Sequence, residues 1–272
     1  MHWKLKCLAF HLLSLPGGNL AYRFAQRNIT KTYFTRLTPE RLRLYSLHVE
    51  HYRRSPGVAL EFGSGGELLA PLLLSAAGAP EILTYDVTSL ANPARVNNII
   101  RQLRQMQPGN WPEIESLADL WTRYRIRYLA PADVRATDLP DKSIDFVWST
   151  STLEHIPTDQ IRAILAECKR ICRGQMSFVI DYHDHYPGVS PCHFYRYGAR
   201  QWRWLNPAWH YQNRLRHGDF ARLFSECGLA TRDDFRAELA TGAQLGPLAA
   251  DFRHYSPEDL MTMQGHFVLS AA

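Results

Sequence analysis

The first third of the chain places two carboxylates and a glycine-rich turn at a spacing that suits a ligand with a sugar and a charged amino group. The first carboxylate, Glu61, begins the run Glu61-Phe62-Gly63-Ser64-Gly65-Gly66. Glycines in such a turn allow positive φ angles and let a ligand approach the backbone closely. Glu61 is placed to hold an ammonium group, directly or through water. The alternative is an ordinary strand–turn–helix with a surface glutamate.

Asp86 is the second carboxylate. It follows Glu61 by about 25 residues, close to the ~20-residue offset of acids that bind a ribose. A carboxylate accepts hydrogen bonds from both ribose hydroxyls, which a neutral side chain cannot match. Capping of a helix is the alternative role for Asp86. A dinucleotide fingerprint would also need glycine at position 68, where the chain has Leu68, so the turn does not favour NAD.

Short apolar segments that alternate with helical ones position these residues, a pattern typical of a parallel sheet. Strands are expected at 59–62, 82–86, 126–129, 144–149, 177–181, 230–235 and 266–270. Helices are expected at 67–77, 93–106, part of 112–124, 159–172, 219–227 and 257–261. The last two strands are close in sequence, so we expect them to pair antiparallel. Residues 1–53 are predicted to form a helical N-terminal extension and residues 54–272 the main domain.

Three further segments follow in order: Asp133-Val134, the run from Leu139 to Val147, and Ser149-Thr150-Ser151-Thr152-Leu153-Glu154-His155-Ile156. With the glycine turn and Asp86, they resemble the class I, seven-stranded methyltransferases that depend on S-adenosylmethionine, over about residues 55–272. The resemblance implies an α/β fold, a three-layer Rossmann-like sandwich with a mostly parallel seven-stranded sheet and an aromatic-rich insertion after the fifth strand.

The resemblance also implies how S-adenosylmethionine, the expected cofactor, is bound. The equivalent of Glu61 serves the methionine moiety, that of Asp86 binds the ribose, and that of Asp133-Val134 borders the adenine. The predicted cofactor contacts are Glu61, Gly63, Ser64, Gly65, Asp86, Asp133, Val134 and Ser149. The family often has a third glycine where this chain has Glu67, and Gly66 can supply the flexibility.

Methyl transfer to a hydroxyl needs alignment of the nucleophile and removal of its proton. In an open α/β sheet, ligands lie beyond the carboxyl ends of the strands, where the polar runs 149–155 and 181–186 are expected. His185 is predicted to be the catalytic base, because an imidazole titrates near neutral pH. Asp181 and Asp184 are predicted to orient it, with His155 as the second candidate base. A structural His155 and a solvated second run are the alternatives.

A divalent metal is the other chemistry that these runs offer, because Glu154, His155 and a histidine of the second run would supply oxygen and nitrogen ligands. The Glu-His pair resembles the metal-binding pair of some class I methyltransferases that act on quinone precursors and RNA ends. Those enzymes have a further glutamate three residues before the pair, where this chain has Ser151. The sequence therefore predicts no metal, and activity that survives chelation.

The segment from His193 to Arg216 interleaves aromatic residues with arginines, which suits stacking on sugars or bases and binding of phosphate. It is similar to an insertion in bacterial class I methyltransferases associated with polysaccharide assembly, in which an Asp-x-x-Asp-His motif and an Asn-Arg-Leu-Arg run recur. An aromatic lid packed on the core is the alternative. The predicted acceptor contacts are His183, Trp202, Asn213, Arg214 and Arg216.

The composition of the chain is compatible with several kinds of methyl acceptor. The chain has 272 residues, 46% of them apolar, and a net charge of +5, which fits a folded domain and does not require a nucleic-acid partner. The expected function is O-methylation of a small molecule, glycan or glycolipid in the cytoplasm. The alternatives are an RNA or nucleotide methyltransferase and a cofactor-binding scaffold without chemistry. Residues 1–15 predict an amphipathic helix that packs on the domain or contacts the inner face of a membrane.

Overall fold

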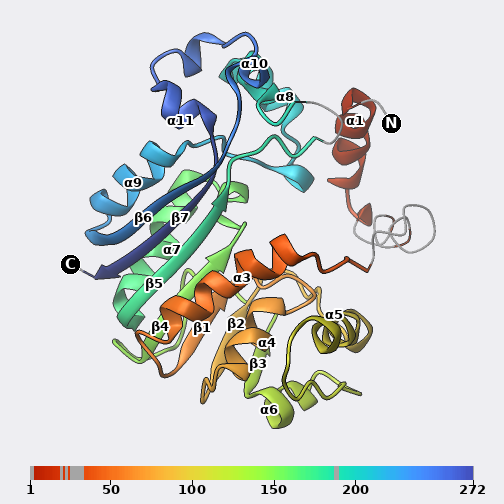
Figure 1. The fold of residues 1–272 in the computed structure, drawn as a ribbon. Coiled ribbons are helices and arrows are strands. Elements are labelled where there is room, and N and C mark those ends of the chain that lie inside the picture. Colours follow the sequence, from red (N-terminus) through yellow and green to blue (C-terminus); the bar gives the residue numbers. More distant parts are fainter. Residues whose placement is uncertain (1–2, 19–20, 22–23, 25–33, 187–189, 272) are drawn as a thin grey trace.

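The computed structural model describes residues 3–18, 21, 24, 34–186 and 190–271. A seven-stranded sheet in the order β3-β2-β1-β4-β5-β7-β6 runs through the molecule (Figure 1). The strands are β1 (Ala59–Phe62), β2 (Ile82–Tyr85), β3 (Ile126–Leu129), β4 (Ile144–Thr150), β5 (Cys172–Asp181), β6 (Leu229–Leu239) and β7 (Thr262–Ala271). The first five strands pair in parallel, and β7 pairs antiparallel with both β5 and β6. The predicted fold class and the antiparallel last pair are confirmed.

Helices cover both faces of the sheet, because its central strands bury side chains on both sides. One apolar core joins Ile82, Phe146 and Trp148 of the strands to the first group of helices. A second core joins Leu60 and Val147 to the other group. The first group is α3 (Pro39–Tyr52), α4 (Leu69–Ala76), α5 (Pro93–Met106) and α6 (Asp119–Tyr124), and the second is α7 (Thr158–Ile171) and α9 (His217–Glu226). These are the three predicted layers.

Helix α3 lies on the sheet. The side chain of Thr38 caps its N-terminus by accepting a hydrogen bond from the backbone N–H of Arg41, and proline at the first turn suits a helix start. Its buried His48 has its ring nitrogens 2.8 Å from Ser177 Oγ and 2.9 Å from Thr150 Oγ1. The helical extension expected before residue 54 therefore contributes a helix to the layer that covers β4 and β5, and the division of the chain into domains at that point stays a prediction.

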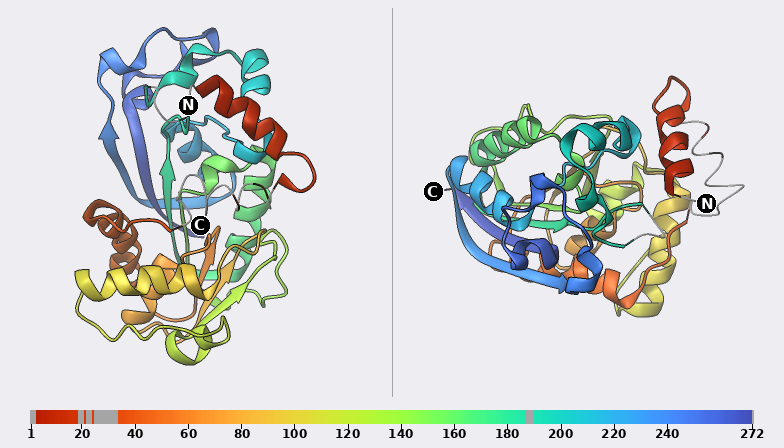
Figure 2. Two further views of the ribbon diagram at one scale, coloured as in Figure 1. Left: turned by 90° about the vertical axis from the view of Figure 1, so that its right-hand side faces the viewer. Right: turned by 90° about the horizontal axis from the view of Figure 1, so that it is seen from above.

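A third apolar cluster forms a cap beyond one end of the sheet, and several segments that are far apart in the sequence share it (Figures 1 and 2). We define the cap as residues 3–18, 190–216 and 240–261. Its short elements are α1 (Trp3–Leu13), η2 (His193–Arg196), α8 (Ala199–Leu205), η3 (Ala208–His210), α10 (Gly242–Leu245), η4 (Ala250–Phe252) and α11 (Pro257–Met261). The aromatic residues of the predicted insertion thus make a core of their own.

Helix α1 has two apolar faces. Trp3, Cys7 and Phe10 are buried in the cap cluster. The opposite side exposes a row of leucines, Leu5, Leu8 and Leu12, each more than half exposed, and Leu15 just beyond the helix is exposed as well. In the described part of the chain, no helix has both the length and the apolar character needed to cross a bilayer. The packed alternative for α1 is thus realised, while contact with a membrane through residues 1–15 stays a prediction; of these residues, the first two lie outside the described ones.

Candidate functional site

The glycine turn joins β1 to α4 and packs against the segment that follows β4. Gly63 and Gly65 have φ angles of 71° and 64°, in the left-handed region that favours glycine. A Cβ atom at Gly63 would also clash with the side chain of Thr152. Any larger residue at position 63 would therefore push the turn away from the end of β4. Leu68 also adopts a positive φ of 57°, so α4 begins at Leu69, two residues later than expected.

Asp86 ties the glycine turn to the end of β2. Its carboxylate accepts hydrogen bonds from the backbone N–H of Gly65 at 2.9 Å and of Thr88 at 2.8 Å. Burial raises the pKa of this carboxyl, and the two backbone donors oppose the rise. The predicted ribose acid thus lies directly against the predicted glycine turn.

A cavity of about 360 Å³ opens beside these residues, within the range of small-ligand sites. It brings together side chains from the ends of β1, β2, β3 and β4, which parallel strands place at one edge of the sheet. Its lining includes the predicted cofactor residues Gly63, Asp86, Asp133 and Val134, the predicted catalytic residue His155, and Phe62, Val87, Ser151, Thr152 and Ile156. Glu61, Ser64, Gly65 and Ser149 are not part of the lining but lie at the same strand ends.

Glu61 is a buried carboxyl with one oxygen engaged. Its Oε1 accepts a hydrogen bond from the indole N–H of Trp148 at 2.9 Å, and its Oε2 has no hydrogen-bond partner in the described structure. Burial raises the pKa of Glu61 to about 8, an effect that the nearby charge of Asp86 reinforces and the Trp148 hydrogen bond opposes. Without a cation beside it, Glu61 is therefore mostly neutral at pH 7.

This pKa predicts how cofactor binding depends on pH. If Glu61 holds an ammonium group, it must ionise on binding, so binding at pH 7 should release close to one proton. Affinity should rise about tenfold from pH 6 to pH 7 and level off near pH 8, where Glu61 ionises and an α-amino group (pKa ~7.7–8.0) begins to lose its proton. Calorimetry in buffers of different ionisation enthalpy measures both effects. Glu61→Gln should abolish the proton release; an unchanged release in that variant would refute the assignment.

Asp133 and Val134 border the cavity in different ways. Asp133 forms an ion pair with Arg135 at 2.5 Å, and hydrogen bonds from that guanidinium lower the pKa of its carboxyl. Val134 is buried in the second core. Asp133 is therefore a charged rim and Val134 an apolar wall, an arrangement that suits the edge and the face of a base.

The polar runs after β4 and β5 meet in space. Asp181 lies 2.6 Å from Nδ1 of His183 and 3.3 Å from Nε2 of His185, and these histidines lower the pKa of its carboxyl against the effect of burial. The rings of His155 and His185 lie 4.8 Å apart between centroids. Since His155 lines the cavity, the cluster adjoins it. The structure thus assembles three of the four predicted catalytic residues, and their roles stay predictions.

Asp184 is the exception among them. Its carboxylate accepts a hydrogen bond from the backbone N–H of Tyr186 at 2.8 Å, and its other oxygen lies 3.6 Å from Nδ1 of His193. Burial raises the pKa of Asp184 to about 6. Asp184 therefore organises the cap loop together with His193, a residue that the sequence did not single out, and Asp181 is the acid beside His185. The expected orienting role of Asp184 stays a prediction.

Residues 30–233 match the family model described as a methyltransferase domain. The chain belongs to this family. No curated protein matches it. Because the matched residues include the glycine turn, Asp86, the cavity lining and both polar runs, the family assignment covers the whole candidate site and most of the sheet.

Solved structures place the methyltransferase among enzymes of the same fold. It is similar to the mitomycin 7-O-methyltransferase MmcR, at 16% identity and a TM-score of 0.51, over 97% of this chain and 60% of that one. It is also similar to a 1,6-didemethyltoxoflavin-N1-methyltransferase from Burkholderia thailandensis, at 12% identity and a TM-score of 0.51, over 100% and 90% of the two chains. A geranyl diphosphate methyltransferase in complex with SAM shares 11% identity and a TM-score of 0.50, over 96% and 94%. The predicted enzyme class and cofactor, S-adenosylmethionine, are confirmed.

The residues at the strand ends fit this cofactor. Three buried polar atoms there have no hydrogen-bond partner in the described structure: Glu61 Oε2, Ser64 Oγ and Ser149 Oγ. Unsatisfied buried polar atoms are costly, so they mark places where a ligand completes the structure. Glu61 would hold the ammonium of the methionine moiety, Asp86 the ribose, and Asp133 and Val134 the adenine.

Asn213 holds the turn that carries Glu154 and His155. Its side-chain amide donates hydrogen bonds to the carbonyls of Leu153 at 2.8 Å and Ile156 at 2.9 Å. Its backbone N–H donates to the carbonyl of Glu154 at 2.8 Å. The turn, η1 (Leu153–His155), is therefore fixed from the cap, and Asn213 is a positioning residue for the cluster.

Trp202 and Arg214 pack on each other inside the cap. The guanidinium of Arg214 lies 4.7 Å from the ring centroid of Trp202 and donates a hydrogen bond to the carbonyl of Tyr197 at 2.5 Å. The indole N–H of Trp202 donates to the carbonyl of Gln212 at 3.2 Å. Because Trp202 is buried, its expected contact with the acceptor is corrected to a packing role.

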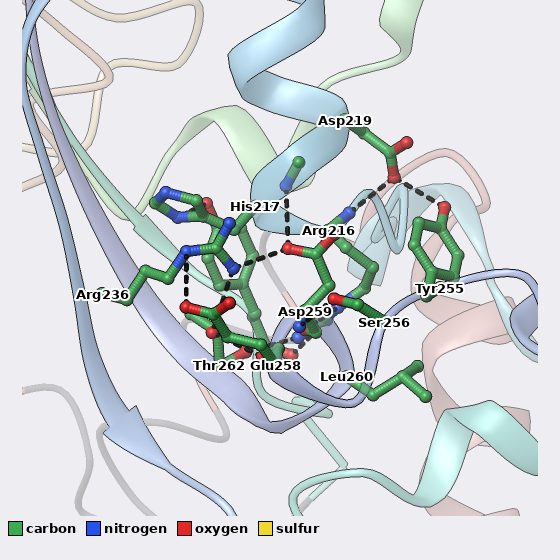
Figure 3. A network of polar contacts seen from close by, with 12 residues as sticks. Arg216, His217, Asp219, Arg236, Tyr255, Ser256, Glu258, Asp259, Leu260 and Thr262 are labelled. Carbon is green, nitrogen blue, oxygen red and sulfur yellow. Dashed lines mark hydrogen bonds and ion pairs between the residues drawn. The ribbon is translucent and has the colours of Figure 1, made fainter.

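Arg216 is fully buried at the base of the cap (Figure 3). Its guanidinium donates to the carbonyls of Tyr182 at 3.1 Å and Thr262 at 2.5 Å, and it lies 4.9 Å from the ring centroid of Tyr182 and 5.1 Å from that of Tyr195. Asp219 accepts from the backbone N–H of Arg216 at 2.9 Å and from the Tyr255 hydroxyl at 2.6 Å. A side chain so enclosed does not reach an acceptor, so that prediction is corrected as well.

Proposed function

We propose that the methyltransferase transfers a methyl group to a hydroxyl oxygen of a small-molecule or glycan acceptor. The observation that carries this proposal is the position of His155, which lines the cofactor cavity and adjoins His185. S-adenosylmethionine supplies a methyl group on a positively charged sulfur, which is already activated for displacement. The new oxygen–carbon bond forms as the carbon–sulfur bond breaks, the bonding electron pair stays on sulfur, and the hydroxyl proton leaves.

The cluster of His155, Asp181, His183 and His185 assists loss of that proton. An alcohol is a poor nucleophile until it is deprotonated, and histidines act near neutral pH. Nδ1 of His155 lies 2.8 Å from the carbonyl of Tyr211, so a backbone contact fixes the orientation of this ring. Burial lowers the pKa of His155, which keeps it neutral at pH 7. A neutral, oriented imidazole is the form that can accept a proton or bind an electrophile.

Two arginines of the cap, Arg214 and Arg216, support a small acceptor over a nucleic acid. Arg214 and Arg216 point to backbone carbonyls and aromatic rings of the cap. Binding of RNA depends largely on arginines and lysines that reach phosphates, and these two are engaged elsewhere. Two arginines of the segment that suggested an RNA or nucleotide acceptor thus build the cap, whereas Arg196, Arg200 and Arg203 of the same segment are exposed.

The experiment that tests this function incubates the protein with isotopically labelled S-adenosylmethionine and a panel of hydroxyl-bearing small molecules and glycans, and locates the label by mass spectrometry. We expect an O-methyl product. Asp86→Ala, assayed with cofactor below the Kd of wild type, serves as the control with weakened cofactor binding, because lost charge-assisted hydrogen bonds cost about 1–3 kcal/mol, or a 5- to 150-fold rise in Kd.

Asp141→Ala is the matched control, since Asp141 is an exposed acid paired with Arg170; its Kd should stay within about twofold of wild type. Label found on nitrogen or carbon, or equal labelling with the Asp86→Ala variant, would reject the proposal.

A further inference from the structure

We propose that Glu154, His155 and His185 bind one divalent transition-metal ion. Each of them offers a ligand atom, and the three atoms all lie within 4.8 Å of one another. The inference rests on the proposed function and deepens it, because a cation at this place would bind the acceptor oxygen and ionise it beside the cofactor cavity.

Glu154 is the strongest sign that something is bound here. The residue is 2% exposed, and neither of its carboxylate oxygens has a hydrogen-bond partner in the described structure. A buried carboxylate without a partner costs several kcal/mol. Among the buried carboxyls of the described residues, Glu61 and Asp184 each have one oxygen without a hydrogen-bond partner, whereas Glu154 has both. A cation between the two runs would satisfy the Glu154 carboxylate.

His155 and His185 are oriented in the way that is usual for metal-binding histidines. Nδ1 of His155 faces the carbonyl of Tyr211 at 2.8 Å, so it is Nδ1 that carries the hydrogen, and Nε2 keeps its lone pair. Asp181 lies 3.3 Å from Nε2 of His185. A carboxylate or a carbonyl behind the ring is the usual support of a metal-binding histidine. Asn213 adds to it by fixing the turn that carries Glu154 and His155.

The donor set selects the kind of ion. Two imidazoles and one carboxylate suit Zn²⁺, Mn²⁺, Fe²⁺ or Co²⁺, whereas Mg²⁺ and Ca²⁺ prefer oxygen ligands alone. Bonds of about 2.0–2.2 Å hold ligand atoms roughly 3.5 Å apart, so the three side chains close by about 1 Å on binding. Three protein ligands leave coordination positions open, as catalytic sites require.

The third ligand, His185, comes from the loop after β5. The absence of a glutamate at Ser151 led to the expectation of no metal. In the structure the chain turns sharply at Ser151, which has a positive φ of 47°, and directs the next residues toward the loop after β5. His185 of that loop completes the trio, so a glutamate at position 151 is not needed for three ligands.

Such an ion defines a class of acceptor. A cation held by Glu154, His155 and His185 would lower the pKa of an acceptor hydroxyl beside it, so that the hydroxyl proton could pass to solvent. Because more than one position is open, an acceptor with two neighbouring oxygens binds best. We therefore expect vicinal diols, catechols or hydroxy acids to be better acceptors than isolated alcohols.

The test measures metal binding apart from activity. Full-length protein is stripped with a chelator and titrated with Zn²⁺, Mn²⁺ and Co²⁺ by calorimetry, with the Co²⁺ absorption spectrum as a second readout. We expect one ion per chain, and a Kd on the order of 100-fold or more weaker in Glu154→Gln and in His185→Ala. His254→Ala removes an exposed histidine of the cap outside the trio, so its Kd should stay within about threefold of wild type.

The results of these titrations and of activity assays distinguish failure of the metal site from failure of the proposed function. No ion bound by folded wild-type protein, or unchanged binding in both variants, overturns the inference, and so does full methyl transfer by the stripped protein. Circular dichroism and S-adenosylmethionine affinity show whether each variant is folded. If the trio binds an ion but no hydroxyl acceptor is methylated, the metal site stands and the proposed function fails. If stripped protein methylates hydroxyls, the function stands and the metal site fails.

Discussion

His185→Ala lowers turnover with a hydroxyl acceptor by about 10²–10⁴-fold, while the Kd for S-adenosylmethionine stays within about twofold of wild type. The imidazole lies beside Asp181 and His155, where the proposed cation and the acceptor hydroxyl meet, so its loss leaves the hydroxyl protonated. The adenosyl contacts come from other strand ends and are unaffected. Initial rates with labelled cofactor and calorimetry of cofactor binding measure the two quantities.

Three other histidines show whether the assignment is right. His254→Ala removes an exposed histidine of the cap and should leave the rate unchanged. His183→Ala should lower the rate less than His185→Ala, although Asp181 is nearest to His183. If His183→Ala inactivates the enzyme and His185→Ala does not, the assignment is wrong by two residues. If only His155→Ala lowers the rate, the residue that assists proton loss lies at the end of β4. If all three active-site variants keep full activity, alignment of the acceptor with the cofactor is sufficient for catalysis.

Arg216→Ala destabilises the protein by about 3–5 kcal/mol, which corresponds to a fall in Tm of roughly 6–20 °C. The substitution would leave the carbonyls of Tyr182 and Thr262 without this donor and open a cavity beside the rings of Tyr182 and Tyr195. These carbonyls lie where β5 ends and β7 begins, so the cap loosens from the sheet. Thermal and denaturant unfolding followed by circular dichroism measure the effect.

Arg222→Ala is the matched control for this variant. Arg222 lies on α9, the helix that begins directly after Arg216, and pairs with Asp219 at 2.5 Å, but its side chain is 65% exposed. Exposed ion pairs contribute about 0–1 kcal/mol, so its Tm should stay close to that of wild type. Equal Tm values for Arg216→Ala and wild type would show that the buried guanidinium does not hold the cap in place.

Most of the sheet could be predicted from patterns within short stretches of sequence. The core segments of all seven strands were placed correctly, because apolar runs bounded by turn residues are short-range signals. Strands β5, β6 and β7 extend beyond the predicted bounds. The residues at these extended ends include polar ones such as Arg173, which pairs with Asp145 at 2.6 Å. Because Asp145 is far from Arg173 in the sequence, no local pattern could predict that Arg173 belongs to a strand.

The candidate site likewise divides into parts that local sequence predicts and parts that depend on contacts between distant residues. The glycine turn and Asp86 could be predicted because a fixed spacing along one strand–turn–helix unit brings them together. The sequence could not show that Asp184 faces His193 while His185 faces His155, since these meetings depend on how the cap folds over the strand ends. Nor could it separate a buried arginine from a phosphate-binding one: an arginine among aromatic residues suits both, and only the burial of Arg216 decides.

The placement of β7 between β5 and β6 sets an order of assembly during translation. Within the sheet β6 pairs only with β7, so the ribosome releases β6 before the strand that anchors it exists. The residues that line the cofactor cavity all lie between 62 and 164, whereas the cap cluster needs Leu260 and Met263. A nascent chain would therefore build the half that binds the methyl donor first, with an open strand edge exposed to chaperones, and would close over the acceptor only after β7 had been inserted.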